Sequence, residues 1–197
     1  MENKASLNPL QISCKNQTDT ITSLLVENTD ADSLLKPSVS NFPLHLLCKS
    51  KEEKLSLIEA ILKKLKEAGS KKNYLKIALN AVDANGSPLL HLALDYGHTH
   101  IVDSLFKNYS ADKNQVDEVG NRAIHLIAKS GSLKMFELLQ AHDALSSEQN
   151  EKMDNPLHIA AFFNNLTFIT KFLELENTDV IKKTNSTPSI QVRQWSL

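Results

Sequence analysis

Histidine and cysteine are the residue types of this chain whose spacing could support metal or thiol chemistry. Four histidines each follow a Leu or an Ile within similar short segments: His45, His91, His125 and His158. His98 and His100 form an additional H-x-H pair, and the two cysteines are Cys14 and Cys48. Imidazole and thiolate groups are ligands that Zn²⁺ prefers, and a thiolate beside an imidazole can act as a nucleophile. Metal binding and thiol catalysis are therefore the two kinds of chemistry to weigh.

The four histidines belong to a segment that recurs along the chain. Its copies are Asn8–Cys14, Phe42–Cys48, Pro88–Leu94, Arg122–Ala128 and Asn155–Ala161, with Gln11 in place of histidine in the first. His91 and His125 are 34 residues apart, and the next step, to His158, is 33. Gln11 and His45 are again 34 apart, whereas the step from His45 to His91 is 46. A period of this length indicates an array of small structural repeats.

The residues around this motif add a second signature. Turn-forming sequences, Asp83–Gly86 and Asp117–Gly120, precede two of the copies, and Gly97, Gly131 and Asn164 stand six residues after a histidine. Glycine and asparagine tolerate the positive φ that closes a helix, so these residues are expected to end the first helices. With these features the chain resembles the ankyrin repeat family over residues 8 to 175; the unit of that family, about 33 residues long, carries T-P-L-H-x-A after a turn. The resemblance implies an all-α fold, an ankyrin-repeat solenoid of helix-turn-helix hairpins with β-turn fingers.

The apolar positions favour the same fold independently. Ten residues after the histidine position stand Ile21, Ile101, Met135 and Phe168, and a Leu or Phe follows four residues later. Helical spacing on both sides of a Gly or Asn indicates two helices per copy, which bury their faces by stacking on neighbours. We therefore expect an ankyrin domain over residues 1–176, with repeats at about 3–36, 37–82, 83–116, 117–149 and 150–176 and the first as N-terminal cap. Residues 177–197 are expected to be a partly disordered tail or the start of a degenerate sixth repeat.

The second repeat is longer than the others, and its extra residues are predicted to lie at two junctions. Three fit around Ser50–Lys54 and ten around Gly69–Ala78, where added length leaves the stack intact. The segment Ser70–Ala81 is predicted to form a short extra helix. The lysine-rich stretch Lys49–Lys76 could dock an anionic partner, but its interleaved glutamates favour a solvated helix face.

The resemblance implies structural roles for the candidate chemical residues. Each motif histidine is expected to tie together backbone groups of neighbouring repeats, and His98 falls where the family often has a surface-facing histidine. Cys14 and Cys48 occupy the position of Ala128 and Ala161 in other copies, so they are expected to be small, buried core residues. The sequence thus predicts no metal site, no cofactor and no catalytic residue, and hence no enzyme.

Composition limits the class of partner. The 22 Lys and Arg residues against 23 Asp and Glu give a net charge of −1, too balanced for nucleic acid or an anionic membrane as primary ligand. No apolar run approaches the roughly 18 residues of a membrane-spanning helix, so direct membrane insertion is not expected. Two cysteines in 197 residues suit a reducing compartment. We expect a monomer in the cytoplasm, with a nuclear location left open.

The resemblance also implies where function lies. Partners of ankyrin proteins usually bind the concave side, formed by the turn tips and the exposed ends of the first helices. The corresponding side chains are Asn85, Ser87, Asp95, Tyr96, Glu118, Val119, Asn121, Lys129, Ser130, Lys152, Asp154, Phe162 and Phe163. Two adjacent aromatic residues at water-facing positions, Phe162 and Phe163, indicate a partner anchor, unless one of them folds onto the tail around Thr187–Ile190.

The function predicted from these residues is a non-catalytic protein-interaction module or scaffold, with a protein partner whose identity the sequence does not give. Two alternatives stay open. The chain could be the N-terminal ankyrin segment of a larger protein, such as a transient receptor potential-type cation channel. It could also be a regulator similar to the ankyrin inhibitors of NF-κB-class transcription factors.

Overall fold

The computed structural model describes residues 7–35, 42–68 and 73–177 of the chain. Within these ranges it contains twelve helices and no strand, apart from an isolated antiparallel bridge between Val82 and Pro88. The helices are α1 (Pro9–Asn16), α2 (Asp19–Asn28), α3 (Ala31–Leu35), α4 (Pro43–Cys48), α5 (Leu55–Glu67), α6 (Tyr74–Asn80), α7 (Leu89–Asp95), α8 (Thr99–Tyr109), α9 (Ala123–Ser130), α10 (Leu133–Ala141), α11 (Pro156–Phe162) and α12 (Leu166–Asn177). Of the predicted tail, 177–197, residues 178–197 lie outside the described residues.

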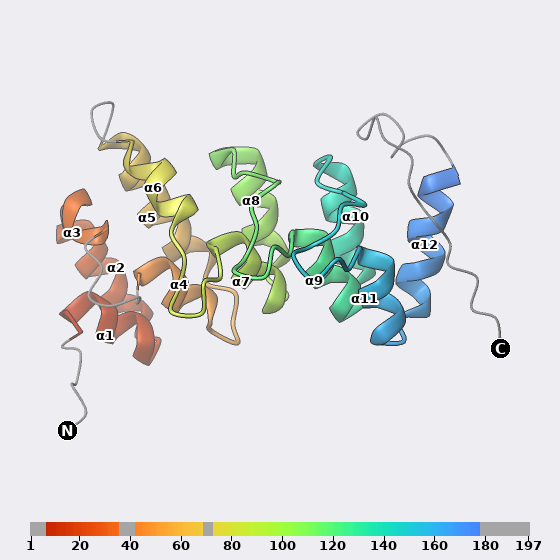
Figure 1. The fold of residues 1–197 in the computed structure, drawn as a ribbon. Helices are drawn as coiled ribbons and strands as arrows, with labels where there is room; N and C mark the ends of the chain where they lie inside the picture. The colour runs from red at the N-terminus through yellow and green to blue at the C-terminus, as the bar shows by residue number, and fades with distance from the viewer. Residues whose placement is uncertain (1–6, 36–41, 69–72, 178–197) are drawn as a thin grey trace, which may run out of the picture.

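Ten of these helices form five hairpins that stack side by side in one row (Figure 1). They are termed pairs 1 to 5 and consist of α1 and α2, α4 and α5, α7 and α8, α9 and α10, and α11 and α12. The first helices contact one another in sequence from α1 to α11, and the second helices do so from α2 to α12. The fold is therefore a two-layer helical solenoid, which confirms the predicted all-α architecture.

The core is a continuous column of apolar side chains between the two layers. Ile101, Met135 and Phe168, at the tenth position after each histidine, are fully buried. Pair 1 departs from the pattern, because Ile21 is 52% exposed. The tenth position faces the preceding pair, and none of the described residues precedes pair 1 in the stack. The outer face of pair 1 is therefore more apolar than is usual for an N-terminal cap.

The predicted extra helix is present as α6. It packs against α5 and against α3, a short helix that the sequence did not predict, and it buries Ala78 and Leu79. The start of α3 is stabilised by Asp30, whose Oδ1 accepts a hydrogen bond from Ser33 N at 2.8 Å. The other insertion, around Ser50–Lys54, forms the loop between α4 and α5. Both insertions leave the stacking of pairs 2 and 3 intact.

The ends of the first helices follow the prediction. Gly97, Gly131 and Asn164 have φ values of 77°, 70° and 57°, the left-handed conformation in which a helix closes. Gln17, at the same position in pair 1, has φ 56° although it is neither Gly nor Asn. The hairpin geometry is thus conserved within the molecule where the preferred residue type is not.

Candidate functional site

Three β-turn fingers project between successive pairs and share one hydrogen-bonding scheme. In the first, Asp83 N donates to Ser87 O at 3.0 Å, and Gly86 N donates to Asp83 O at 3.1 Å. The Oδ1 atom of Asp83 accepts from Asn85 N and Ser87 N, at 2.9 Å each. Asp117 and Asn150 organise the other two fingers in the same way. The two turns predicted from the sequence are confirmed, and Asn150 supplies a third.

Neighbouring fingers lie against each other. Glu151 N donates to Val119 O at 3.1 Å, and a Cβ placed on Gly120 would lie 2.9 Å from that same nitrogen. A Cβ on Gly86 would overlap the Glu118 side chain. The two glycines are therefore required both for their positive φ and for the close approach of the next finger.

One of the predicted partner-binding side chains, Asn121, forms hydrogen bonds within and between the fingers. Asn121 Nδ2 donates to Asp117 Oδ2 at 3.0 Å, and Asn121 Oδ1 accepts from Asn150 Nδ2 at 2.7 Å. Both ends of the amide are thus used inside the protein. The assignment of Asn121 to a partner site is corrected accordingly: it holds adjacent fingers together.

Three motif histidines tie each pair to the finger that follows it or to the segment that leads into that finger. Their Nε2 atoms lie 3.0, 3.1 and 3.2 Å from the carbonyl oxygens of Ala81, Gln115 and Asp154. The histidines in question are His45, His91 and His125. Burial lowers the pKa of each imidazole, so each is held neutral with its Nε2 proton donated to the carbonyl. The predicted structural role is confirmed for these three.

The fourth motif histidine, His158, does not play this role. It is exposed, and its Nδ1 accepts a hydrogen bond from Asn155 N at 3.2 Å. The structure gives its Nε2 no acceptor in residues 7–35, 42–68 or 73–177, because none of these forms a finger after pair 5. Within those ranges the expected link from His158 to a following repeat is therefore absent, and its contact with Asn155 stabilises the start of α11.

His98 is also placed differently from the expectation. It is 3% exposed, and its Nε2 lies 3.0 Å from Cys48 O and 3.1 Å from Ser50 O of pair 2. Asn165, at the same position in pair 5, donates to Ala128 O at 2.6 Å and to Lys129 O at 2.8 Å. In pairs 3 and 5 the seventh position after the histidine therefore forms a second link to the preceding pair, whereas His98 was expected at the surface.

The cysteines and the other histidines do not assemble a reactive centre in the described part of the chain. Cys14 and Cys48 are buried free thiols; burial raises the pKa of Cys14 to about 12 and also raises the pKa of Cys48. Within the described ranges, no three His, Cys, Asp or Glu side chains gather in a way that could hold a metal ion. A thiolate nucleophile is disfavoured at both positions because the thiols are desolvated.

Several lysines of the Lys49–Lys76 stretch already form ion pairs or hydrogen bonds with other residues of this chain. Lys49 pairs with the buried Asp83 at 2.7 Å, and Lys54 pairs with Asp19 and Glu52 at 2.8 Å each. Lys64 Nζ donates to two carbonyl oxygens at the end of α2, at 2.7 Å each. These contacts favour a structural and solvated role over an anion-docking one.

Among the described helices, none is long and apolar enough to span a bilayer.

The fourth and fifth positions after the histidine form a row along the ends of the first helices. Its members are Lys49 and Ser50, Asp95 and Tyr96, Lys129 and Ser130, and Phe162 and Phe163. Together with the fingertips, this row is termed the inner face. Ser50 is buried, whereas Asp95, Lys129 and Ser130 are exposed. Tyr96 is 46% exposed and stacks on the His98 ring at 6.1 Å.

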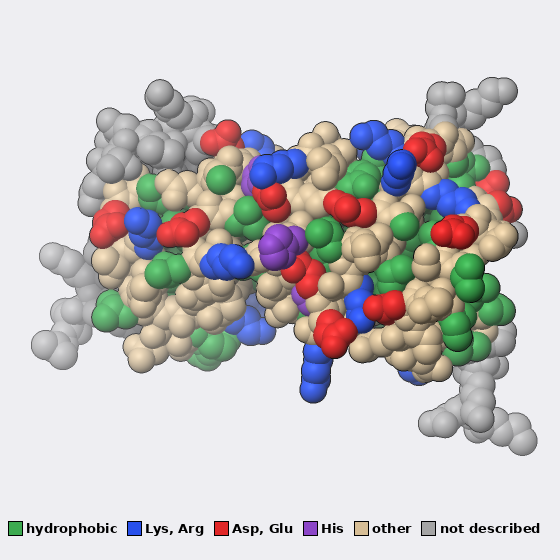
Figure 2. Space-filling view, turned by 180° about the vertical axis from the view of Figure 1, so that it is seen from behind, with side chains coloured by type: hydrophobic (Ala, Val, Ile, Leu, Met, Phe, Trp, Pro, Cys, Tyr) green, Lys and Arg blue, Asp and Glu red, His purple; other side chains and the backbone are tan. Residues whose placement is uncertain are grey.

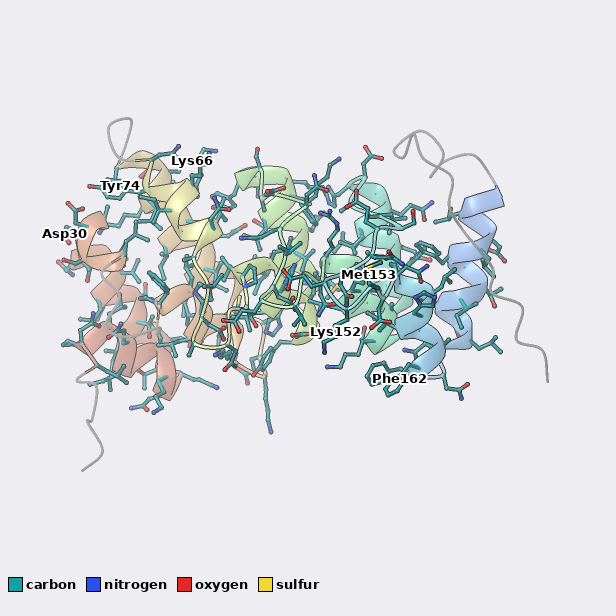
Figure 3. All side chains as sticks on the ribbon, in the orientation of Figure 1. Asp30, Lys66, Tyr74, Lys152, Met153 and Phe162 are labelled. Atoms are coloured by element: carbon teal, nitrogen blue, oxygen red, sulfur yellow. The ribbon has the colours of Figure 1, made fainter. Side chains whose placement is uncertain are left out.

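The row becomes apolar at pair 5. Phe162 is 83% exposed and Phe163 is 45% exposed, with ring centroids 5.1 Å apart and edge to face. Figure 3 shows Phe162 projecting from the end of α11. The Lys129 ammonium lies 5.9 Å from the Phe163 centroid, within reach of a cation–π contact. The predicted tail contact around Thr187–Ile190 lies outside the described residues.

The fingertips complete the inner face. Asn85, Glu118 and Lys152 are exposed at the three tips, whereas Val119, also at a tip, is partly buried, as are Ser87 and Asp154 at the bases of their fingers. Met153 is 65% exposed with φ 64°, in the position that glycine holds in the other two fingers. Lys152 and Met153 lie at adjacent places on the last finger in Figure 3.

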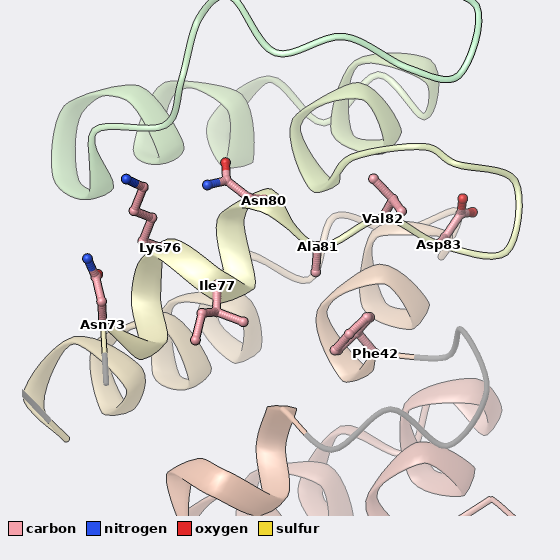
Figure 4. Close-up of a pocket in the computed structure, with 8 residues that line it drawn as sticks. All are labelled: Phe42, Asn73, Lys76, Ile77, Asn80, Ala81, Val82 and Asp83. Atoms are coloured by element: carbon pink, nitrogen blue, oxygen red, sulfur yellow. The ribbon is translucent and has the colours of Figure 1, made fainter. Parts of the chain in front are cut away.

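A groove that the sequence did not predict lies beside the extra helix. It has a volume of about 730 Å³ and is lined by Phe42, Asn73, Lys76, Ile77, Asn80, Ala81, Val82 and Asp83 (Figure 4). Ile77 and Val82 are exposed within it. Hydrophobic periodicity marked α6 as a helix but gave no sign of how it would sit against the base of the first finger.

Comparison with known proteins gives partial matches. The family model for ankyrin repeats, comprising three copies, matches residues 10–117 and 90–184. A probable protein S-acyltransferase 23 of Arabidopsis thaliana is 35% identical over 69 residues, which is 35% of this chain and 13% of that protein. A homolog of transient receptor potential cation channel subfamily A member 1 of Caenorhabditis elegans is 36% identical over 61 residues, 31% of this chain and 5% of that protein. The chain thus spans a small fraction of both relatives.

Proposed function

Because the chain belongs to the ankyrin repeat family, we propose that it is a non-catalytic module that binds a partner protein on its inner face. Ankyrin repeats are protein-interaction modules, and the matched region covers both layers of the stack. The buried thiols and the neutral, hydrogen-bonded imidazoles offer no activated nucleophile or general base, which supports a binding function. Two free cysteines suit a reducing compartment, and we place the module in the cytoplasm.

The observation that carries this proposal is the exposure of aromatic side chains at the end of the row. Phe162 and Phe163 occupy the fourth and fifth positions after the histidine. The same two positions hold Lys129 and Ser130 in pair 4, and Asp95 and Tyr96 in pair 3. Packing within the stack does not require apolar residues at these positions, since the preceding pairs fill them with polar ones. Exposed aromatic residues of this kind commonly become the buried anchors of an interface.

The rest of the inner face supplies specificity in this proposal. Phe163 and Tyr96 are the anchors, and Asp95, Lys129 and Lys152 are exposed charges around them. Lys49 contributes little, because its charge is already neutralised by Asp83. The partner site is therefore centred on pairs 3 to 5 rather than on pair 2.

The experiment that tests the proposal recovers the partner with the full chain and then maps its site. Immobilised wild-type protein is used to capture binding proteins, which are identified by mass spectrometry, and the capture is repeated with Phe163→Ala and Tyr96→Ala. The matched control is Lys63→Ala, which removes an exposed side chain from α5 on the other layer. We expect one captured protein to be lost from both aromatic variants and retained by the control. Retention by all three would place the site elsewhere.

A second candidate is that this chain is the ankyrin part of a larger protein, such as a transient receptor potential-type channel. The similarity to the nematode channel homolog favours it, although it covers only 61 residues. An immunoblot of the native protein would separate the two: a band near 22.0 kDa favours a stand-alone module, and a much heavier band favours the larger protein. An NF-κB-inhibitor-like regulator would instead reveal itself by a transcription factor among the captured proteins.

A further inference from the structure

The outer face of pair 1 presents three aliphatic side chains to solvent. Ile12, Ile21 and Leu24 are 46%, 52% and 56% exposed, although all three are large and apolar. Hydrophobic side chains gather at the right-hand end of Figure 2, the end of the molecule at which pair 1 lies. A terminal repeat of a soluble solenoid ordinarily carries a polar outer face. This end is therefore built unlike a cap.

The same positions join neighbouring pairs elsewhere in the stack. Ile21 corresponds to Phe168 of pair 5, whose ring lies 5.4 Å from the Phe136 ring of pair 4. Leu24 corresponds to Ser104 of pair 3, whose Oγ donates to Glu59 Oε1 of pair 2 at 2.7 Å. These contacts show that the tenth and thirteenth positions after the histidine face the preceding pair. Pair 1 thus presents one half of an internal seam.

The other half of that seam is exposed at the opposite end. The eleventh and fifteenth positions face the following pair, as shown by Phe136 and by Phe106, which contacts the His142 ring at 4.9 Å. In pair 5 these positions hold Ile169, which is partly buried, and Leu173, which is 42% exposed. Both are aliphatic, so they match the aliphatic side chains of pair 1 in chemistry.

We propose that the protein associates head to tail, with pair 5 of one copy packing against the outer face of pair 1 of a second copy. A second copy is the occupant that the structure favours, because the chain itself carries both halves of the seam. The net charge of −1 creates no long-range repulsion between copies. This arrangement departs from the monomer expected from the sequence, and it leaves the inner face free for the proposed partner.

Head-to-tail contact is heterologous, which gives it a distinctive consequence. Each copy has one end of each kind, so association continues beyond two copies, into an open chain or a closed ring, and the average mass rises with concentration. A symmetric contact between two pair 1 faces would instead stop at a dimer. The two geometries can therefore be told apart by blocking one end at a time.

The test measures the mass of the full chain by light scattering across a range of protein concentrations. Ile21→Glu blocks the pair 1 face and Leu173→Glu blocks the pair 5 face; both side chains are exposed, so the fold should survive, as circular dichroism would verify. Ile77→Glu is the matched control, since it charges an exposed aliphatic side chain on α6, away from both ends. We expect wild type and the control to grow in mass with concentration and each end variant to stay monomeric.

An equimolar mixture of the two end variants provides the decisive measurement. Each retains one intact end, so the mixture should form a 1:1 dimer and nothing larger, although neither variant associates alone. A wild-type chain that stays monomeric at every concentration would overturn the proposal. So would a Leu173→Glu variant that still dimerises by itself, since that result would indicate a symmetric pair 1 contact.

Discussion

The interior pairs and the last pair use the same positions for different purposes. In pair 4, His125 is buried and bonded to the next finger, and Gly120 lies under Glu151. In pair 5, His158 is exposed, and Met153 occupies the place of that glycine with most of its side chain in solvent. Where another pair follows, the side chain at such a position is buried or hydrogen-bonded against it. Where the described chain has no following pair, the side chain at the same position is exposed to solvent. The contrast predicts that equivalent substitutions in the two regions have unequal effects.

The largest difference is expected for phenylalanine. Phe136→Ala should destabilise the protein by about 3–5 kcal/mol, because the ring is fully buried and contacts the rings of Phe168 and Phe172. Phe162→Ala should change stability by less than about 0.5 kcal/mol, because that side chain is 83% exposed. Thermal unfolding of both variants measures the comparison. Similar losses would mean that Phe162 is packed in the native protein.

The histidines provide the next comparison. His125→Ala should cost about 1–3 kcal/mol, since it leaves the Asp154 carbonyl and the Arg122 amide without their partner in the middle of the stack. His158→Ala should cost less than about 0.5 kcal/mol, because it removes one exposed contact at the end of the stack. Equal shifts in melting temperature would contradict the claim that the following finger gives the histidine its role.

The glycine position of the fingers sharpens the same point. Gly120→Ala should cost at least about 1–2 kcal/mol, because φ is 73° and the added Cβ would press on Glu151 N. Met153→Gly should stay within about 1 kcal/mol of wild type, because relief of the positive φ is offset by the greater freedom of glycine in the unfolded chain. Chemical denaturation of the two variants would test this, and a neutral Gly120→Ala would argue against contact between fingers.

The smallest expected effect concerns pH. Burial lowers the pKa of His45, His91 and His125, so the unfolded chain takes up more protons than the folded one once the pH falls below about 6.5. The stability that depends on these three neutral histidines should therefore be fully present above that pH and be lost as the pH is lowered. Melting temperatures between about pH 8 and pH 5 should fall less steeply for His125→Gln than for wild type. Parallel profiles for the two proteins would contradict the burial argument.

The parts of this structure that could be predicted are those fixed by local spacing. A histidine or glycine that recurs every 33 or 34 residues occupies the same backbone environment in successive repeats. The structural roles of His91, His125, Gly97 and Gly131 could therefore be predicted. The acceptors of His91 and His125 lie 24 and 29 residues further along the chain, so the period located the histidines but not their hydrogen-bond partners.

The parts that could not be predicted depend on which neighbour is present. Helical periodicity placed Ile21 in the apolar series, but it does not say whether a preceding pair exists to bury that side chain. His98 reaches back to Cys48 and Ser50, carbonyls at the edge of an insertion whose path the motif does not encode. Asn121 was assigned to a partner because the family resemblance places it at a fingertip, whereas Asn150 of the adjacent finger donates a hydrogen bond to it. Each of these three errors concerns a contact between neighbouring repeats rather than a contact within one repeat.

The partner site on the inner face is the central claim, and an isothermal titration of the captured partner into Phe163→Ala tests it most directly. We expect an unchanged melting temperature and a Kd about 30-fold weaker than that of wild type, the equivalent of about 2 kcal/mol for an aromatic anchor. Lys63→Ala should bind as wild type does. A Kd for Phe163→Ala that equals the wild-type value, with the fold intact, would contradict the claim that the exposed end of the row is the binding site.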